Sequence, residues 1–166
     1  SVDIGDEPFQ IYQKNPDTVV AVDEKRVHGV TELCKFYPNL DIILLDDAFQ
    51  HRQIKPGLSI LLTDYSHLFT RDYHLPSGNL RECKFGSQRA DILIVTKCPS
   101  DITSLEMTQL EDELKIGTHQ DLFFSSYEYW EISAVFSNSD VRNLKLEELQ
   151  NSKIGILALA GIVHPG

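Results

Sequence analysis

The sequence lacks the features that mark several common classes of protein. Its three cysteines, Cys34, Cys83 and Cys98, are odd in number, and their separations match neither a zinc site nor a disulfide framework. Its most apolar stretch, residues 154–163, is about half the roughly 20 residues that a membrane-spanning helix needs. The sequence therefore predicts a chain that works in a reducing cytoplasm and has no transmembrane segment of its own.

Basic charge is also scarce. The chain has 15 Lys and Arg against 25 Asp and Glu, a formal net charge of −10, and its basic residues form no concentrated patch. Because proteins bind phosphate backbones through such patches, we expect no nucleic-acid partner. The chain begins at Ser1 without an initiator Met or an apolar leader, so we expect no signal peptide and a true N-terminus upstream.

Apolar runs of strand length alternate with segments of helical periodicity, as in a parallel sheet covered by helices. The predicted fold class is therefore α/β. The expected strands are residues 19–22, 42–45, 59–63, 91–96 and 153–162. One helix is expected where Val27, Val30, Leu33 and Cys34 share a face, and a second over residues 102–116.

A change in composition predicts the domain organisation. Six aromatic residues crowd into short β-like runs within residues 122–136, unlike anything before them. We expect residues 1–121 to form a first domain, residues 122–136 a β-type linker, and residues 137–166 the truncated start of a second α/β domain.

Two carboxylates, Asp46 and Asp47, follow the apolar run 42–45. Four apolar residues ending in Asp resemble the Walker B arrangement, in which a carboxylate binds the Mg²⁺ that bridges nucleotide phosphates. The pattern is short, and Asp is also common in the loops that follow strands, so a capping role is an equal alternative. None of the nine glycines lies in the phosphate-binding pattern GxxxxGK[ST]. If the chain binds a nucleotide, that loop is expected upstream of Ser1.

Four motifs make the pattern more specific. They are Gly5-Asp6-Glu7-Pro8, then Asp46-Asp47-Ala48-Phe49-Gln50-His51, then Leu75-Pro76-Ser77-Gly78-Asn79-Leu80-Arg81-Glu82, and finally Gly161-Ile162-Val163-His164-Pro165. In this order they resemble tetraacyldisaccharide 4'-kinase, the lipid A 4'-kinase of Gram-negative bacteria, over essentially the whole chain. Ala48, Ser77 and Asn79 depart from the usual family residues at positions to which we assign no side-chain chemistry.

The resemblance implies a P-loop kinase that transfers the γ-phosphoryl group of ATP to the 4'-hydroxyl of a tetraacyldisaccharide 1-phosphate, giving lipid IVA. It implies a P-loop NTPase-like, mostly parallel sheet, a β linker and a second α/β domain. It also implies ATP and Mg²⁺, a lipid A disaccharide precursor as partner, and a peripheral location on the cytoplasmic face of the bacterial inner membrane. Since the phosphate loop is missing, we expect the 166-residue piece alone to be inactive.

The resemblance also implies roles for individual residues. Asp6 is the expected catalytic base and His164 the partner that orients it, although Asp6 alone would be interpreted as a helix cap and His164 as a surface histidine. Asp46 is the expected Mg²⁺ ligand and Asp47 a cofactor-binding neighbour. Glu82 is expected to complete the metal site, with an ordinary exposed glutamate as the alternative.

Three further residues are candidates for substrate binding. Gln50 and His51 belong to the second motif, and His51 is equally compatible with a loop histidine bonded to backbone. Arg81 could contact a phosphate through its planar fork or pair with a surface carboxylate.

Two other functions remain open from the sequence. The run Val95-Thr96-Lys97-Cys98-Pro99 is similar to the [NT]KxD element of GTP-binding proteins but lacks its Asp, so a P-loop GTPase-like switch is the alternative enzyme class. A non-catalytic α/β binding domain is the third hypothesis.

Overall fold

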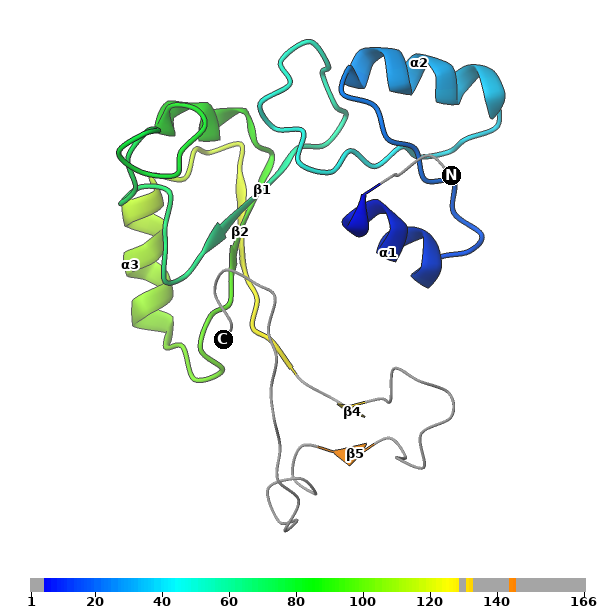
Figure 1. Ribbon diagram of the computed structural model, residues 1–166. Coiled ribbons are helices and arrows are strands. Elements are labelled where there is room, and N and C mark those ends of the chain that lie inside the picture. Colours follow the sequence, from blue (N-terminus) through cyan, green and yellow to red (C-terminus); the bar gives the residue numbers. More distant parts are fainter. Residues whose placement is uncertain (1–4, 129–130, 133–143, 146–166) are drawn as a thin grey trace. The chain divides into compact units, whose positions relative to one another are not determined.

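The computed structural model describes residues 5–128, 131–132 and 144–145, and it divides the chain into two compact units, Ser1–Ser125 and Ser126–Gly166. The elements of the first unit, in chain order, are α1 (Asp6–Lys14), α2 (Arg26–Phe36), β1 (Ile60–Asp64), the 3₁₀ helix η1 (Lys84–Arg89), β2 (Ile92–Thr96), α3 (Ser104–Leu114) and β3 (Asp121–Phe124) (Figure 1). In the second unit, the two-residue strands β4 (Glu131–Ile132) and β5 (Leu144–Lys145) pair antiparallel.

The first unit contains a three-stranded parallel sheet in the order β1-β2-β3. Its register sets Leu61 opposite Leu93, and Leu93 opposite Leu122. Parallel neighbours need a crossover connection, and α3 supplies one between β2 and β3. The α/β class and the parallel sheet predicted from the sequence are thus confirmed, with helical elements beside the strands.

One face of the sheet forms the core. Val95 of β2 packs with Leu110 and Leu114 of α3, and with Leu68 and Cys98 from the segments after β1 and β2. The helix begins with a capping box, in which the Thr103 side chain and Glu106 satisfy each other's backbone amides. The opposite face is open, because Ile60 and Leu62 of β1 and Phe123 of β3 are exposed.

Two predicted strands are wrong. Residues 19–22 and 42–45 form no strand, and the side chains of Ile42 and Leu44 are 75% and 90% exposed. A strand exists only when its backbone groups bond to a neighbouring strand, and in the described part of the chain no strand pairs with either segment. The apolar run indicates a preference for burial but does not supply that partner, so Asp46 follows a segment without regular secondary structure and not a β-strand.

The other helices and strands predicted in the first unit are confirmed, with small differences in their ends. The strands predicted at 59–63 and 91–96 are β1 and β2, and the helices predicted around Val27 and over 102–116 are α2 and α3. The strand predicted at 153–162 lies outside the described residues. The sheet extends to Phe124, three residues into the range assigned to the linker, and the division at 121 and 136 stays a prediction.

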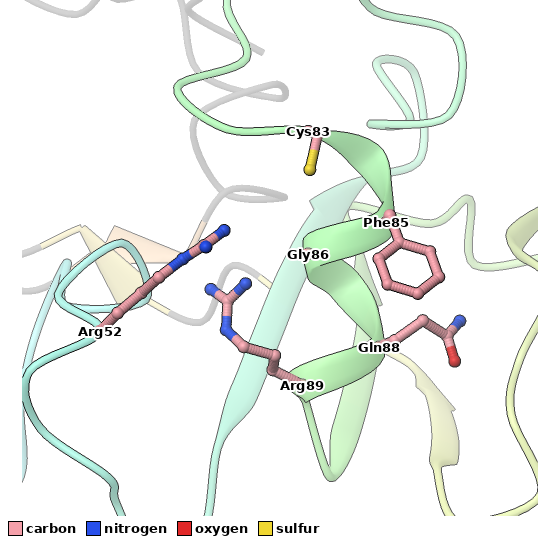
Figure 2. A pocket seen from close by; sticks show the side chains of 6 residues that line it. All are labelled: Arg52, Cys83, Phe85, Gly86, Gln88 and Arg89. Carbon is pink, nitrogen blue, oxygen red and sulfur yellow. The ribbon is translucent and has the colours of Figure 1, made fainter.

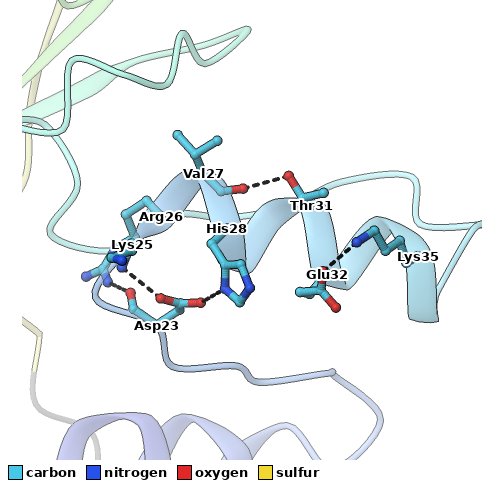
Figure 3. Close-up of polar contacts among 8 residues, drawn as sticks. All are labelled: Asp23, Lys25, Arg26, Val27, His28, Thr31, Glu32 and Lys35. Carbon is cyan, nitrogen blue, oxygen red and sulfur yellow. Dashed lines mark hydrogen bonds and ion pairs between the residues drawn. The ribbon is translucent and has the colours of Figure 1, made fainter.

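The start of α2 is held by Asp23 (Figure 3). Its Oδ1 accepts a hydrogen bond from the Lys25 amide at 2.7 Å, and its Oδ2 lies 2.6 Å from Nδ1 of His28. Arg26 donates to the Asp23 carbonyl. Gly29 is required beside this cluster, because a Cβ there would lie 2.9 Å from the Cβ of Asp23.

Candidate functional site

The turn at residues 46–51 is held by its own hydrogen bonds. Asp46 Oδ1 accepts from the Asp47 amide at 2.9 Å, and the Asp47 carbonyl accepts from Nε2 of Gln50 at 3.1 Å. The His51 amide donates to the Ala48 carbonyl at 2.9 Å. Asp47 has a positive φ of 44°, a conformation that Asp tolerates better than most residues. The turn leaves both aspartate side chains exposed.

Arg81 brings a second motif to this turn. Its Nη1 donates to Oδ2 of Asp47 at 2.7 Å, although the two residues are 34 positions apart in the sequence. Both side chains are largely exposed, so the pair is accessible to solvent. The structure thus places two predicted site residues, Asp47 and Arg81, in direct contact.

Glu82, next to Arg81, lies between two arginines. Its Oε1 is 2.7 Å from Nη2 of Arg89, and its Oε2 is 3.4 Å from Nη2 of Arg52. Arg89 also donates to the Phe49 carbonyl at 2.9 Å, and its guanidinium lies over the Phe49 ring, 4.5 Å from the ring centroid. Arg89 therefore ties Glu82 to the turn that contains Asp46 and Asp47.

The loop before Arg81 is organised by Asp72. The Asp72 carboxylate accepts the backbone amide of Tyr73 at 2.7 Å and the amide of Asn79 at 3.2 Å. These amide hydrogen bonds, that of Tyr73 first, hold the pKa of Asp72 below its usual range. The Leu80 amide and carbonyl bond to Tyr73 and Leu75, which closes the loop and fixes where Arg81 leaves it.

Asp6 lies elsewhere in the first unit, in the first turn of α1. The capping residue is Gly5, with a φ of 82°, so the interpretation of Asp6 as the cap is wrong, and Asp6 is the first helical residue. In the part of the chain that the structure describes, the Asp6 side chain makes no hydrogen bond or ion pair that relates it to Asp46, Asp47 or Glu82. Its predicted partner His164 lies outside the described residues.

A further charged pair sits where β1 and β2 end. Nζ of Lys97 lies 2.8 Å from Oδ2 of Asp64, and Ser66 donates to Oδ1 of Asp64 through both its amide and its hydroxyl. The Lys97 contact first, and the Ser66 bonds next, hold the pKa of Asp64 well below its usual range. Ligands of open α/β sheets bind beyond the carboxyl ends of the strands. Lys97, which directly follows β2, lies at this end of the sheet.

The arrangement of acidic side chains limits how a metal could bind. Within the described ranges, no group of three or more His, Cys, Asp or Glu side chains is arranged to hold an ion. Mg²⁺ in nucleotide sites usually takes only one or two carboxylates and completes its shell with phosphates and water. Asp46 fits that use, because its Oδ2 accepts no hydrogen bond from the described residues. Both carboxylate oxygens of Glu82 already accept hydrogen bonds from arginines, so a metal at Glu82 would compete with these contacts.

Sequence reasoning missed three residues of this region. Arg52, Asp72 and Arg89 position the predicted site residues, but none of the three lies in one of the four motifs. Their signal was indirect: Arg52 and Arg89 are basic residues near motifs of an acidic chain. Nothing in residue spacing indicates that both would meet at Glu82.

No helix among the described residues has both the length and the apolar character needed to cross a bilayer. No solved structure matches the chain. A family profile described as Tetraacyldisaccharide-1-P 4'-kinase matches residues 1–166.

Several curated relatives carry the name Tetraacyldisaccharide 4'-kinase. The protein from Bacteroides thetaiotaomicron is 46% identical over 169 residues, covering 98% of this chain and 44% of the relative. The protein from Bacteroides fragilis strain YCH46 is 48% identical over 164 residues, covering 98% and 43%. The protein from Flavobacterium johnsoniae is 43% identical over 162 residues, covering 98% and 46%.

The chain therefore spans less than half the length of these relatives. Because the family profile covers every residue of it, the chain belongs to the tetraacyldisaccharide-1-P 4'-kinase family.

Proposed function

We propose that the chain is part of an enzyme that transfers the γ-phosphoryl group of ATP to the 4'-hydroxyl of a tetraacyldisaccharide 1-phosphate, giving lipid IVA. The observation that carries the proposal is the contact of Arg81 with Asp47, which joins two family motifs. Family membership supports the choice of reaction, because curated relatives carry the name of this kinase.

Phosphoryl transfer requires positioning and neutralisation of charge more than covalent chemistry from the protein. We assign the Mg²⁺ of Mg-ATP to Asp46, whose exposed carboxylate has an oxygen to spare for a cation. When bound, the ion would neutralise charge on the β- and γ-phosphates. Asp47 borders the nucleotide, and Arg81 fixes its carboxylate in the orientation that the site needs.

The proton of the attacking hydroxyl also needs an acceptor. We assign this role to Asp6, with His164 orienting it. As the bond between the 4'-oxygen and the γ-phosphorus forms and the bond to the β-phosphate oxygen breaks, the hydroxyl proton passes to Asp6 and ADP leaves. Gln50 and His51 are assigned to substrate contacts, since the turn that they belong to also carries Asp46.

The same proposal gives the protein its partners and place. The lipid A disaccharide precursor is the acceptor, and its acyl chains require access to a membrane surface. We therefore place the protein peripherally on the cytoplasmic face of the bacterial inner membrane.

The test uses the full-length product of the gene, Mg-ATP and a tetraacyldisaccharide 1-phosphate. We expect radiolabel from γ-labelled ATP to appear on the disaccharide. Asp6→Asn should abolish turnover while ATP affinity, measured by titration, stays within about twofold, because the general base acts only on the acceptor.

Glu7→Gln, a change of the neighbouring carboxylate on the same helix, is the matched control for charge and helix stability. If Asp6→Asn keeps full activity, the base is another residue. If the wild-type protein phosphorylates no such disaccharide, the proposed function itself is wrong.

A further inference from the structure

A pocket lies between η1 and the segment that follows the 46–51 turn. Six residues line it, Arg52, Cys83, Phe85, Gly86, Gln88 and Arg89, and its volume is about 220 Å³ (Figure 2). The guanidinium groups of Arg52 and Arg89 point toward each other across it, from separate segments of the chain.

The pocket has an excess of positive charge. Arg52 and Arg89 share the single carboxylate of Glu82, so two positive charges face one negative charge. Glu82 accepts from one nitrogen of each guanidinium, Nη2 in both cases. The Nε and Nη1 groups of both arginines make no hydrogen bond with any described residue. A guanidinium has five N–H donors, so both keep donors for a ligand.

Local structure fixes the position of the Arg89 guanidinium. Gly86 is buried in η1, and a Cβ at this position would lie 2.9 Å from Nη1 of Arg89 and would also collide with Oε1 of Glu82, so the glycine lets both side chains pack close against η1. Phe49 stacks under the Arg89 guanidinium, which fixes its plane. A glycine and an aromatic ring therefore position Arg89, and the shared carboxylate of Glu82 holds both guanidiniums at the pocket.

We propose that this pocket binds the 1-phosphate group of the sugar acceptor. Guanidinium forks match the oxygens of a phosphate, and a phosphate monoester can accept from both arginines while balancing their unpaired charge. The ligand's identity rests on the proposed function, in which both reactants carry phosphate. The phosphates of ATP are expected on a glycine-rich loop, which leaves this pair of arginines for the acceptor's 1-phosphate.

The first experiment measures binding without turnover, so it does not depend on kinase activity. Glucosamine 1-phosphate and ADP are titrated separately into the full-length protein, with affinity read from amide chemical shifts that include Gly86. Arg52→Gln and Arg89→Gln should each weaken glucosamine 1-phosphate by about 10-fold, as expected for one lost charged hydrogen bond. ADP affinity should change by less than about twofold.

Arg71→Gln is the matched control, because Arg71 is an equally exposed arginine paired with a glutamate, Glu113, away from the pocket. It should leave both affinities unchanged. Arg52→Lys keeps the charge without the fork and should recover only part of the binding. Because Arg52 is the more exposed of the pair, its variants keep the test valid even if Arg89→Gln disturbs the fold.

The second experiment is kinetic. In the full-length kinase, Arg52→Gln should raise KM for the 1-phosphorylated acceptor by about 10-fold with little change in KM for ATP. A weakening confined to ADP or to KM for ATP would overturn the assignment to the acceptor. Unchanged glucosamine 1-phosphate affinity in both arginine variants would overturn the pocket as a phosphate site, whatever the kinase assay shows.

Discussion

Nη1 of Arg81 lies 2.7 Å from Oδ2 of Asp47, which links two motifs that the chain separates by 34 residues. Both side chains are exposed, so the ion pair adds little to the stability of the fold. Its expected role in the site is to orient the Asp47 carboxylate. This contrast between stability and activity can be measured.

Arg81→Gln is expected to change the free energy of unfolding by less than about 1 kcal/mol, because solvent screens an exposed ion pair. Activity of the full-length enzyme should fall by at least about 10-fold, since Asp47 loses the group that orients it. Thermal unfolding and steady-state kinetics on the same preparations check both statements. A large loss of stability with normal activity per folded molecule would show that the pair is structural.

A second arginine pair has the opposite balance. Nε and Nη2 of Arg71 donate to the two carboxylate oxygens of Glu113 at 2.7 and 2.6 Å, and the Thr70 hydroxyl also donates to Oε1. This joins the segment after β1 to α3. Arg71→Gln should lower the free energy of unfolding measurably, because the bidentate geometry makes this pair stronger than an ordinary exposed ion pair. Lys35→Gln, which removes a single-bond pair in α2, is the control and should cost less.

The same pair predicts a dependence on acid. The Arg71 bond, as the largest cause, lowers the pKa of Glu113 below 4.5. A lowered folded pKa means that the stabilisation is complete above 4.5 and is lost as pH falls through the folded value. The difference in Tm between wild type and Arg71→Gln should therefore shrink as pH falls below 4.5.

Most of the sheet and its covering helix could be predicted from the sequence, because their signals are local. Continuous apolar runs predicted β1 and β2, and helical periodicity over residues 102–116 predicted α3. The run at 42–45 carried the same signal and failed, since a strand depends on a partner that a run of side chains does not specify. Burial was therefore predicted correctly only where neighbouring strands are present.

The candidate site divides in the same way. Motifs identified Asp47 and Arg81, and the structure places them together. Motifs did not indicate that Glu82 would be held by Arg52 and Arg89, because those contacts depend on how η1 lies against the turn. His164 lies outside the described residues, and Asp6 has no described contact with the turn. Their joint role therefore stays a prediction.

Core packing under the sheet gives a fourth prediction. Leu114 of α3 is buried in the cluster with Val95 and Leu68. Leu114→Ala should lower the free energy of unfolding by about 2–5 kcal/mol, through lost burial and the cavity left behind. Leu105→Ala on the same helix is the control, since its side chain is exposed, and it should change stability by less than about 0.5 kcal/mol. Chemical denaturation measures both, and equal effects would contradict the assignment of the core to this face of α3.

The last prediction concerns the histidine at the start of α2. The hydrogen bond to Asp23, followed by the charge of the same carboxylate, raises the pKa of His28 above 6.5. A raised folded pKa means that the pair stabilises fully below 6.5 and that this contribution is lost as pH rises through the folded value. The pKa of Asp23 is lowered, first by the His28 bond, so its contribution is lost only in acid.

A titration of the His28 ring signals by NMR should therefore give a pKa above 6.5 in the wild-type protein. Asp23→Asn should bring it back toward 6.5, because the carboxylate is the main cause of the shift. Glu32→Gln removes a weaker charge one turn away and should lower the pKa less. If the two variants lower the His28 pKa equally, the shift comes from the general negative charge of the helix surface and not from the 2.6 Å contact with Asp23.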